Sequence, residues 1–322
     1  MGQRQIGFII LILALAACSS PSVITAIPTE ATVTVGIPPT LTPDLTAPET
    51  TSPLPEPTKT PTPTNTPEPE APQLPDPAAS AIIARAEGGI NSFLLVGGSQ
   101  NGNWVNAGDV VERQPSGSEY KLYTAFASHG WAAGSKPTYE MICDQYYVDL
   151  EQFSVSQSAV GVTGAWDVLP RVPLELSTEL EVYLRAITGW QIEQAPSMPI
   201  PVIDRIWKID IEGDGVDEVF INGTRYAEPT GHNVGPRDYS VVLMRKVIGS
   251  DVITVELVGD YYREEAENQF PLTYNLELIG DLNGDGKMEV VVGVSRWEGT
   301  GVMVFEINDV NAQLVLSVMC SQ

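Results

Sequence analysis

Basic residues, histidine and cysteine are all scarce in this chain. Its 322 residues include 17 Lys and Arg against 41 Asp and Glu, which gives a formal net charge of −24 at pH 7. Proteins that bind nucleic acid neutralise phosphates with clustered Lys and Arg, so this balance excludes a broad nucleic-acid surface. Only 2 His and 3 Cys are present, which leaves little room for a His-rich metal site or for a Ser/His/Asp centre.

Sequence motifs of common enzymes are missing as well. The chain contains no G-x-S-x-G motif, so its sequence does not support a serine hydrolase. It contains no P-loop and no G-x-G-x-x-G, so its sequence does not support nucleotide binding. Pairs of catalytic carboxylates are defined by their separation in space, and the sequence alone cannot select one. We therefore name no catalytic residue and no organic cofactor, and we expect a protein that is not an enzyme.

The first eighteen residues have the pattern of an export signal. Arg4 precedes an apolar run of about ten residues, which is too short to span a bilayer. The run ends in Leu15, Ala16, Ala17 and Cys18, and these residues resemble the lipobox of bacterial lipoproteins. The resemblance implies that residues 1–17 are a signal peptide and that Cys18 carries the lipid that anchors the protein to a membrane. The expected location is extracytoplasmic, in the cell envelope or at the cell surface. An ordinary buried cysteine after an apolar helix is the alternative.

A segment rich in proline and threonine follows the cysteine. Residues 19–77 contain 16 Pro and 14 Thr. This composition cannot bury a core, and proline favours extended polyproline II backbone. We predict that residues 18–77 form a disordered tether that starts at the lipidated cysteine. A spacer that reaches across an envelope layer and a passive linker are both compatible with this segment.

Residues 78–322 are predicted to form one extracytoplasmic globular domain. Short apolar or alternating runs recur, with Gly, Asn, Asp or Pro near their ends, which is typical of strands joined by turns. The predicted strands are 92–96, 119–126, 146–150, 159–163, 206–211, 218–221, 239–244, 252–258, 274–279, 289–294, 302–307 and 314–318. Helices are expected over 78–86 and over 178–188, where Thr178 and Glu181 fit a capping box and Gly189 a stop signal. The predicted fold class is α+β, predominantly β, with antiparallel sheets and one or two short helices.

Two cysteines remain once Cys18 is assigned to the lipid. In an oxidising compartment, Cys143 and Cys320 predict a disulfide that ties the last strand to the first half of the domain. Sequence spacing says nothing about the distance between their Cα atoms, so two separate buried thiols are the alternative.

An acidic segment occurs twice, 71 residues apart, at 210–219 and 281–290. Each copy has oxygen-bearing side chains at positions 1, 3, 5 and 9. Glycine at position 6 permits a sharp turn, so that the carbonyl of position 7 faces inward. Such a set of oxygens predicts a structural cation, and Ca²⁺ suits it better than Mg²⁺. The expected ligands are Asp210, Glu212, Asp214, Val216 through its carbonyl and Glu218 in the first loop, and Asp281, Asn283, Asp285, Lys287 through its carbonyl and Glu289 in the second.

These loops differ from an EF-hand at position 12, which is Ile221 in one copy and Val292 in the other. A loop that closes at position 9 and continues into a strand resembles the calcium loops of FG-GAP and VCBS-type repeats. The resemblance covers about ten residues twice and implies a structural Ca²⁺ and partial propeller-like repeats. The second loop fits better, because Glu212 stands where Asp or Asn is usual. A hairpin held by Asx turns, with no metal, is the alternative.

Together these features predict a lipid-anchored envelope protein with a calcium-stabilised domain that binds or adheres without catalysis. Its expected partners are the membrane, through Cys18, and an extracellular protein or glycan. An extracytoplasmic carbohydrate-binding module or hydrolase is the alternative, in which Trp104 and Trp297 at loop edges stack on sugar rings. A metal-independent structural envelope protein is a third interpretation.

Overall fold

The computed structural model describes residues 80–85, 92–151, 158–195, 198–228, 233–267, 269–297 and 299–320. The chain divides into two units, Met1–Thr66 and Pro67–Gln322, and every described residue belongs to the second. The predicted signal peptide, Cys18 and the Pro/Thr-rich tether lie outside the described residues. Within the described ranges, no helix is long and apolar enough to cross a membrane.

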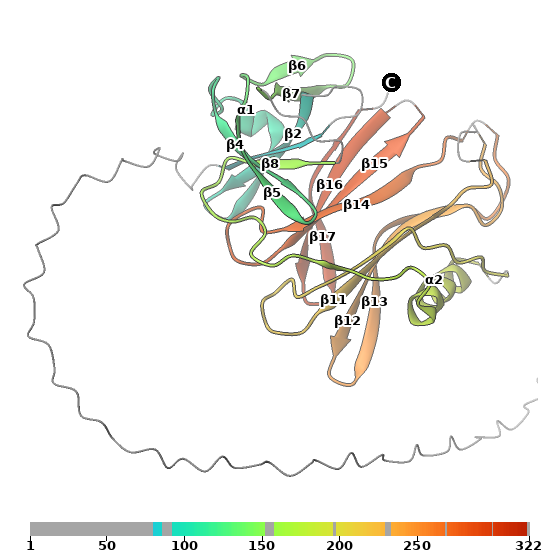
Figure 1. Ribbon diagram of the computed structural model, residues 1–322. Coiled ribbons are helices and arrows are strands. Elements are labelled where there is room, and N and C mark those ends of the chain that lie inside the picture. The colour runs from blue at the N-terminus through green and yellow to red at the C-terminus, as the bar shows by residue number, and fades with distance from the viewer. Residues whose placement is uncertain are drawn as a thin grey trace, which may run out of the picture. The chain divides into compact units, whose positions relative to one another are not determined.

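The described strands form three antiparallel sheets, which confirms the predicted fold class (Figure 1). The N-terminal sheet has the order β5 (Ala127–Ala133), β4 (Glu119–Thr124), β8 (Val160–Val162), β1 (Ser80–Arg85), β2 (Ser92–Gln100), β7 (Gln145–Asp149) and β6 (Thr138–Glu140), with β3 (Asn103–Asn106) paired to β2. The middle sheet has the order β13 (Asp251–Tyr261), β12 (Tyr239–Ile248), β11 (Glu218–Arg225), β10 (Arg205–Ile209) and β9 (Leu174–Glu175). The C-terminal sheet has the order β14 (Thr273–Gly280), β15 (Glu289–Arg296), β16 (Gly299–Asn308) and β17 (Asn311–Met319). The helices are α1 (Ala107–Val111) and α2 (Glu181–Gln194).

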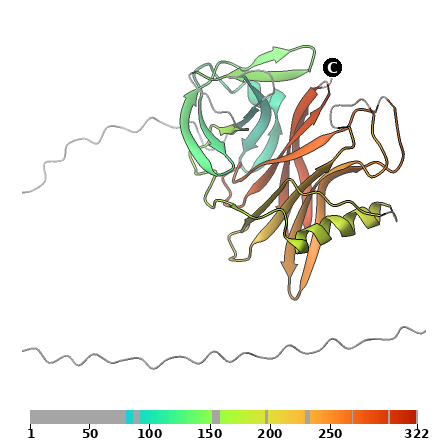
Figure 2. The same cartoon turned by 45° about the vertical axis from the view of Figure 1, so that its right-hand side comes forward.

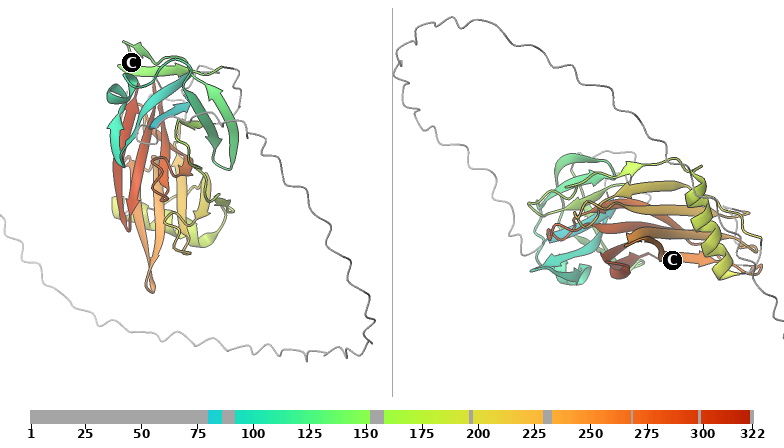
Figure 3. Two further views of the ribbon diagram at one scale, coloured as in Figure 1. Left: turned by 90° about the vertical axis from the view of Figure 1, so that its left-hand side faces the viewer. Right: turned by 90° about the horizontal axis from the view of Figure 1, so that it is seen from below.

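The C-terminal sheet is buried on both faces. Val290 packs with Trp207 and Phe220 of the middle sheet, whereas its neighbour Val291 packs with Ile82 of the N-terminal sheet. Side chains alternate between the two faces of a strand, so both faces must be apolar here. The layers therefore follow the order N-terminal sheet, C-terminal sheet, middle sheet and α2, and α2 lies across the outer face of the middle sheet (Figures 2 and 3).

All of the sequence runs predicted as strands contribute to strands of the structure. The helix predicted over 78–86 is wrong, because Ser80–Arg85 forms β1. This segment contains helix-favouring alanines, but it pairs with β2 on one side and β8 on the other. Burial in the middle of a sheet outweighs an intrinsic preference of a few tenths of a kcal/mol per residue, about the size of the helix-propensity scale.

The second predicted helix exists, with different ends. It begins after Leu180, which makes no side-chain capping bond, so the capping box predicted at Thr178 is wrong. It continues through Gly189 to Gln194, because Ile187 and Trp190 pack together into the middle sheet. Burial of these two side chains exceeds the cost of about 1 kcal/mol for glycine inside a helix.

The 71-residue sequence repeat is also a repeat of structure. Strands β10 to β13 form an antiparallel meander, and β14 to β17 form another. In both meanders an acidic loop joins the first strand to the second. The two meanders pack face to face through one apolar cluster, and this arrangement brings the two acidic loops to neighbouring places in the molecule.

Candidate metal centre

The aspartate at position 1 organises each acidic loop from within. Asp210 accepts backbone N–H bonds from Gly213 (2.6 Å), Asp214 (3.2 Å) and Gly215 (2.8 Å). Burial alone would raise the pKa of Asp210, but these donors lower it below its ordinary value. Gly213 and Gly215 have φ of 78° and 87°, a backbone region that favours glycine.

The second loop repeats this arrangement. Asp281 accepts backbone N–H bonds from Gly284 (2.6 Å) and Gly286 (3.0 Å), and these glycines have φ of 82° and 89°. Burial raises the pKa of Asp281, against the effect of these donors. The backbone of both loops is thus built by the same residues at the same positions.

The glutamate at position 9 is fully buried in both loops. Glu218 is 0% exposed and accepts the N–H of Ile211 at 3.1 Å. Glu289 is 1% exposed and accepts the N–H of Leu282 at 2.7 Å. A buried carboxylate is costly without a compensating charge. The charge of the side chain next to each glutamate therefore determines whether that cost is offset.

A lysine compensates the negative charge of the first loop. Lys246 of β12 is 5% exposed, and its Nζ contacts carboxylates of both Glu212 and Glu218, the latter at 3.3 Å. Burial raises the pKa of Glu218, and Lys246 opposes that rise. Burial would lower the pKa of Lys246, but the two glutamates raise it above its ordinary value. Lys246 therefore places a positive charge beside both glutamates of the first loop.

The second loop has a glutamate in the corresponding place. Strand pairing of Val219 with Arg245 and of Val290 with Phe305 makes Lys246 and Glu306 equivalent. Among the described residues, no lysine or arginine pairs with Asp281, Asp285 or Glu289. Burial, with Asp285, Asp281 and Glu306 nearby, raises the pKa of Glu289 to about 9. The second loop thus carries oxygen-bearing side chains of the type that hard cations prefer, whereas the first loop has the ammonium of Lys246 beside its glutamates.

Asx turns, which the metal-free interpretation predicts, are present too. Asp214 accepts the N–H of Val216 at 2.8 Å, and Asp285 accepts the N–H of Lys287 at 2.8 Å. Asn283 accepts the N–H of Asp285 at 2.9 Å. No group of three or more His, Cys, Asp or Glu within the described ranges is assembled as a ready metal site. The Asx turns therefore account for the loop backbone, but they place no positive charge beside Glu289.

A connecting strap, which the sequence did not point to, joins the two loops. It is the segment 166–171 between β8 and β9. Trp166 donates its indole N–H to the carbonyl of Asp281 at 2.7 Å. Arg171 donates to the carbonyl of Ile211 at 3.0 Å and to that of Gly286 at 3.1 Å. One side chain thus bridges both loops, and no local pattern could have shown it, because its partners lie far away in the sequence.

The other sequence-predicted residues lie outside the acidic loops themselves. Cys143, in the turn between β6 and β7, forms a disulfide with Cys320, which follows β17. Trp104 is half-buried and donates to Glu306 at 2.8 Å, beside the second loop. Trp297 is 54% exposed. The structure thus brings Trp104 close to the second loop through Glu306.

Comparison of the chain with protein-family models, with curated proteins and with solved structures finds no match. The class that the fold defines is a layered, predominantly β domain with two related meanders.

Proposed function

We propose that this chain is a lipid-anchored cell-envelope protein, held by Cys18 and tethered by residues 18–77, that displays a calcium-stabilised, non-enzymatic binding module. The anchor and the tether rest on the N-terminal sequence patterns alone. One observation supports the calcium: Glu289 is fully buried and pairs with no lysine or arginine in the described part of the chain, whereas its equivalent, Glu218, pairs with Lys246. A divalent cation held by Asp281, Asn283, Asp285, Glu289 and the carbonyl of Lys287 would supply the missing charge.

A cation in the second loop has a role in stability. That loop begins β15, which is buried between two sheets. A cation that neutralises the carboxylates at the start of β15 would therefore stabilise the C-terminal sheet and the strands that pack on it. In this proposal the acidic loop stabilises the fold, and the surfaces that bind a partner lie elsewhere on the domain.

Thermal unfolding of the full-length protein in detergent, first in excess EDTA and then across a Ca²⁺ titration, tests this proposal. A ligand at about 100 times its Kd adds about 2.7 kcal/mol, so the midpoint should rise by several degrees. In Glu289→Gln we expect the response to Ca²⁺ to disappear. We also expect this variant to be at least as stable as the native protein in EDTA, because the amide has the shape of the buried carboxyl and cannot ionise.

The matched control is Glu218→Gln, the same change at the same position of the first loop. It leaves Lys246 with one fewer carboxylate, so it should lower stability both in EDTA and in Ca²⁺, and it should keep the response to Ca²⁺. An unchanged midpoint at millimolar Ca²⁺ in the native protein would show that both loops are metal-free hairpins and would remove the calcium from the proposal.

Carbohydrate binding is the second candidate, because the indole of Trp297 is more than half exposed at the end of β15. Sugar rings stack on such faces. Binding to a glycan array that is lost in Trp297→Ala would favour this candidate.

A further inference from the structure

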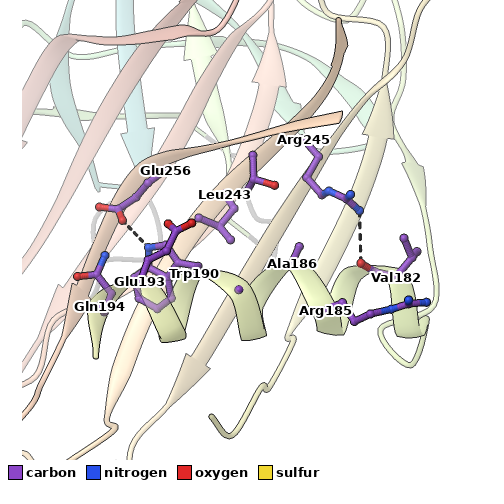
Figure 4. Close-up of a pocket in the computed structure, with 11 residues that line it drawn as sticks. Val182, Arg185, Ala186, Trp190, Glu193, Gln194, Leu243, Arg245 and Glu256 are labelled. Carbon is purple, nitrogen blue, oxygen red and sulfur yellow. Dashed lines mark hydrogen bonds between the residues drawn. The ribbon is translucent and has the colours of Figure 1, made fainter. Parts of the chain in front are cut away.

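A groove lies between α2 and the outer face of the middle sheet (Figure 4). Its volume is about 490 Å³, within the range of ligand sites. Ile187 and Trp190 anchor the helix to the sheet. Among the helix residues that line the groove, Ala186 and Gly189 are small. A Cβ placed on Gly189 would meet no atom within 4 Å. The helix is therefore packed tightly along one stripe and leaves open space along the next.

The groove has opposite charges at its two ends. Figure 4 shows Arg185 and Arg245 toward the N-terminal end of α2, and Glu193 and Glu256 toward its C-terminal end. Eight residues separate Arg185 from Glu193, which corresponds to about 12 Å along a helix axis. The helix dipole has the same polarity, positive at the arginine end and negative at the glutamate end. Side chains and backbone thus create one dipolar groove.

The arginine end has unused hydrogen-bonding capacity. Arg245 donates through Nη1 to the carbonyl of Val182 at 3.3 Å, but its buried Nε has no acceptor in the described part of the chain. Arg185 pairs with Glu181 at 3.6 Å, and both side chains are largely exposed. Exposed pairs of this kind are weak and exchange partners readily. A carboxylate in the groove would pair with the guanidinium groups of Arg245 and Arg185.

The glutamate end is fixed in orientation. Glu256 accepts the indole N–H of Trp190, whose ring is only 6% exposed. This indole holds the carboxylate in place but offers no open face on which a sugar ring could stack. The two glutamates also repel a polyanion such as a phosphate ester. The chemistry that remains is a ligand with an ammonium at one end and a carboxylate at the other.

We propose that this groove binds a short peptide of three residues with free termini. An extended chain spans at most about 3.3–3.6 Å per residue, so a tripeptide matches the separation of the charges and a single amino acid does not. The peptide carboxylate lies at Arg245 and Arg185, and its ammonium lies at Glu256 and Glu193. This site uses no residue of the acidic loops, so it goes beyond the calcium-stabilised module and does not depend on it.

Calorimetric titration of the full-length protein with trialanine tests the site. We expect saturable binding with one peptide per chain. N-acetyl-trialanine and trialanine amide each lack one terminal charge, and each should bind at least about tenfold more weakly, since tenfold corresponds to the loss of a single modest ionic contact. Equal binding of the free and blocked peptides would overturn the proposal, and so would no heat of binding at millimolar peptide.

Variants locate the binding in the groove. Gly189→Leu fills the open space without removing a charge and should abolish binding. Gly189→Ala is its matched control and should retain it, with a stability no lower than native because alanine favours helix. Glu256→Gln keeps an acceptor for Trp190 and should weaken binding of trialanine but not of N-acetyl-trialanine. Full binding by Gly189→Leu, with an unchanged circular dichroism spectrum, would place the peptide elsewhere and overturn the proposal.

Discussion

The charge beside the buried glutamate differs between the two acidic loops because of a single residue. Both loops place a buried glutamate at position 9, and both shape their backbone around the aspartate at position 1. The difference is Lys246 in one meander and Glu306 in the other, at equivalent positions of their strands. The sequence preference for the second loop rested on the length of Glu212. In the structure Glu212 contacts the ammonium of Lys246, a contact that side-chain length alone does not reveal.

A buried tyrosine gives a prediction of pH dependence. Tyr120 is 0% exposed, its hydroxyl has no hydrogen-bond partner among the described residues, and burial raises its pKa above the ordinary value of 10.0. The folded state therefore holds the phenolic proton more tightly than the unfolded state. This contribution to stability is complete below pH 10 and is lost as pH rises above it.

Tyr120→Phe should remove this dependence. We expect a free energy of unfolding about 1 kcal/mol higher than native near neutral pH, because an unsatisfied buried hydroxyl is removed. We also expect a shallower fall in stability above pH 10. Urea unfolding at a series of pH values measures both effects. A variant that is less stable than native at neutral pH would show that the hydroxyl has a partner.

At the scale of elements, the strap 166–171 makes the two loops one unit. Arg171 donates to a carbonyl in each loop, so Arg171→Met should loosen both. Hydrogen bonds from a charged donor contribute about 1.5–3 kcal/mol, and we expect a loss of this size in urea unfolding. Amide hydrogen exchange should accelerate at Gly215 and Gly286 together.

The control for the strap is Arg263→Met, which changes an exposed arginine and should leave both amides unaffected. Faster exchange in only one loop of Arg171→Met would mean that the loops are independent. Exchange in α2 should stay as in the native protein, because that helix packs on the far face of the middle sheet.

Strands were easier to predict than their neighbours because their signal is local. Alternation of apolar and polar residues, bounded by turn residues, identified β10 to β17, including both strands of each acidic hairpin. The strand β1 was mistaken for a helix because its alanines favour helix and its isoleucines favour strand, so that only its two partner strands decide. The loop residues at positions 1 and 9 were identified for the same local reason, whereas Lys246 and Arg171 reach the loops from distant segments.

At the scale of the whole molecule, the fold is a stack whose central layer is the last part of the chain. The C-terminal sheet is buried between the N-terminal and middle sheets. Its stability therefore depends on two partner layers, and the partners depend on it. We expect the described domain to unfold in one cooperative step, since neither outer sheet could lose the central one without exposing an apolar face.

The disulfide should contribute to the stability of this stack as a whole. Cys143 and Cys320 join the β6–β7 hairpin of the N-terminal sheet to the end of β17, across a sequence separation of 177 residues. Closing a loop of that length removes conformational entropy from the unfolded chain worth up to about 5 kcal/mol. At about 2–4 °C per kcal/mol for a domain of this size, reduction should lower the unfolding midpoint by roughly 10–20 °C. Cys143→Ser/Cys320→Ser should reproduce the reduced protein without added thiol. A midpoint that falls by less than about 2 °C in both samples would show that packing between the sheets, rather than the covalent link, holds the last strand in place.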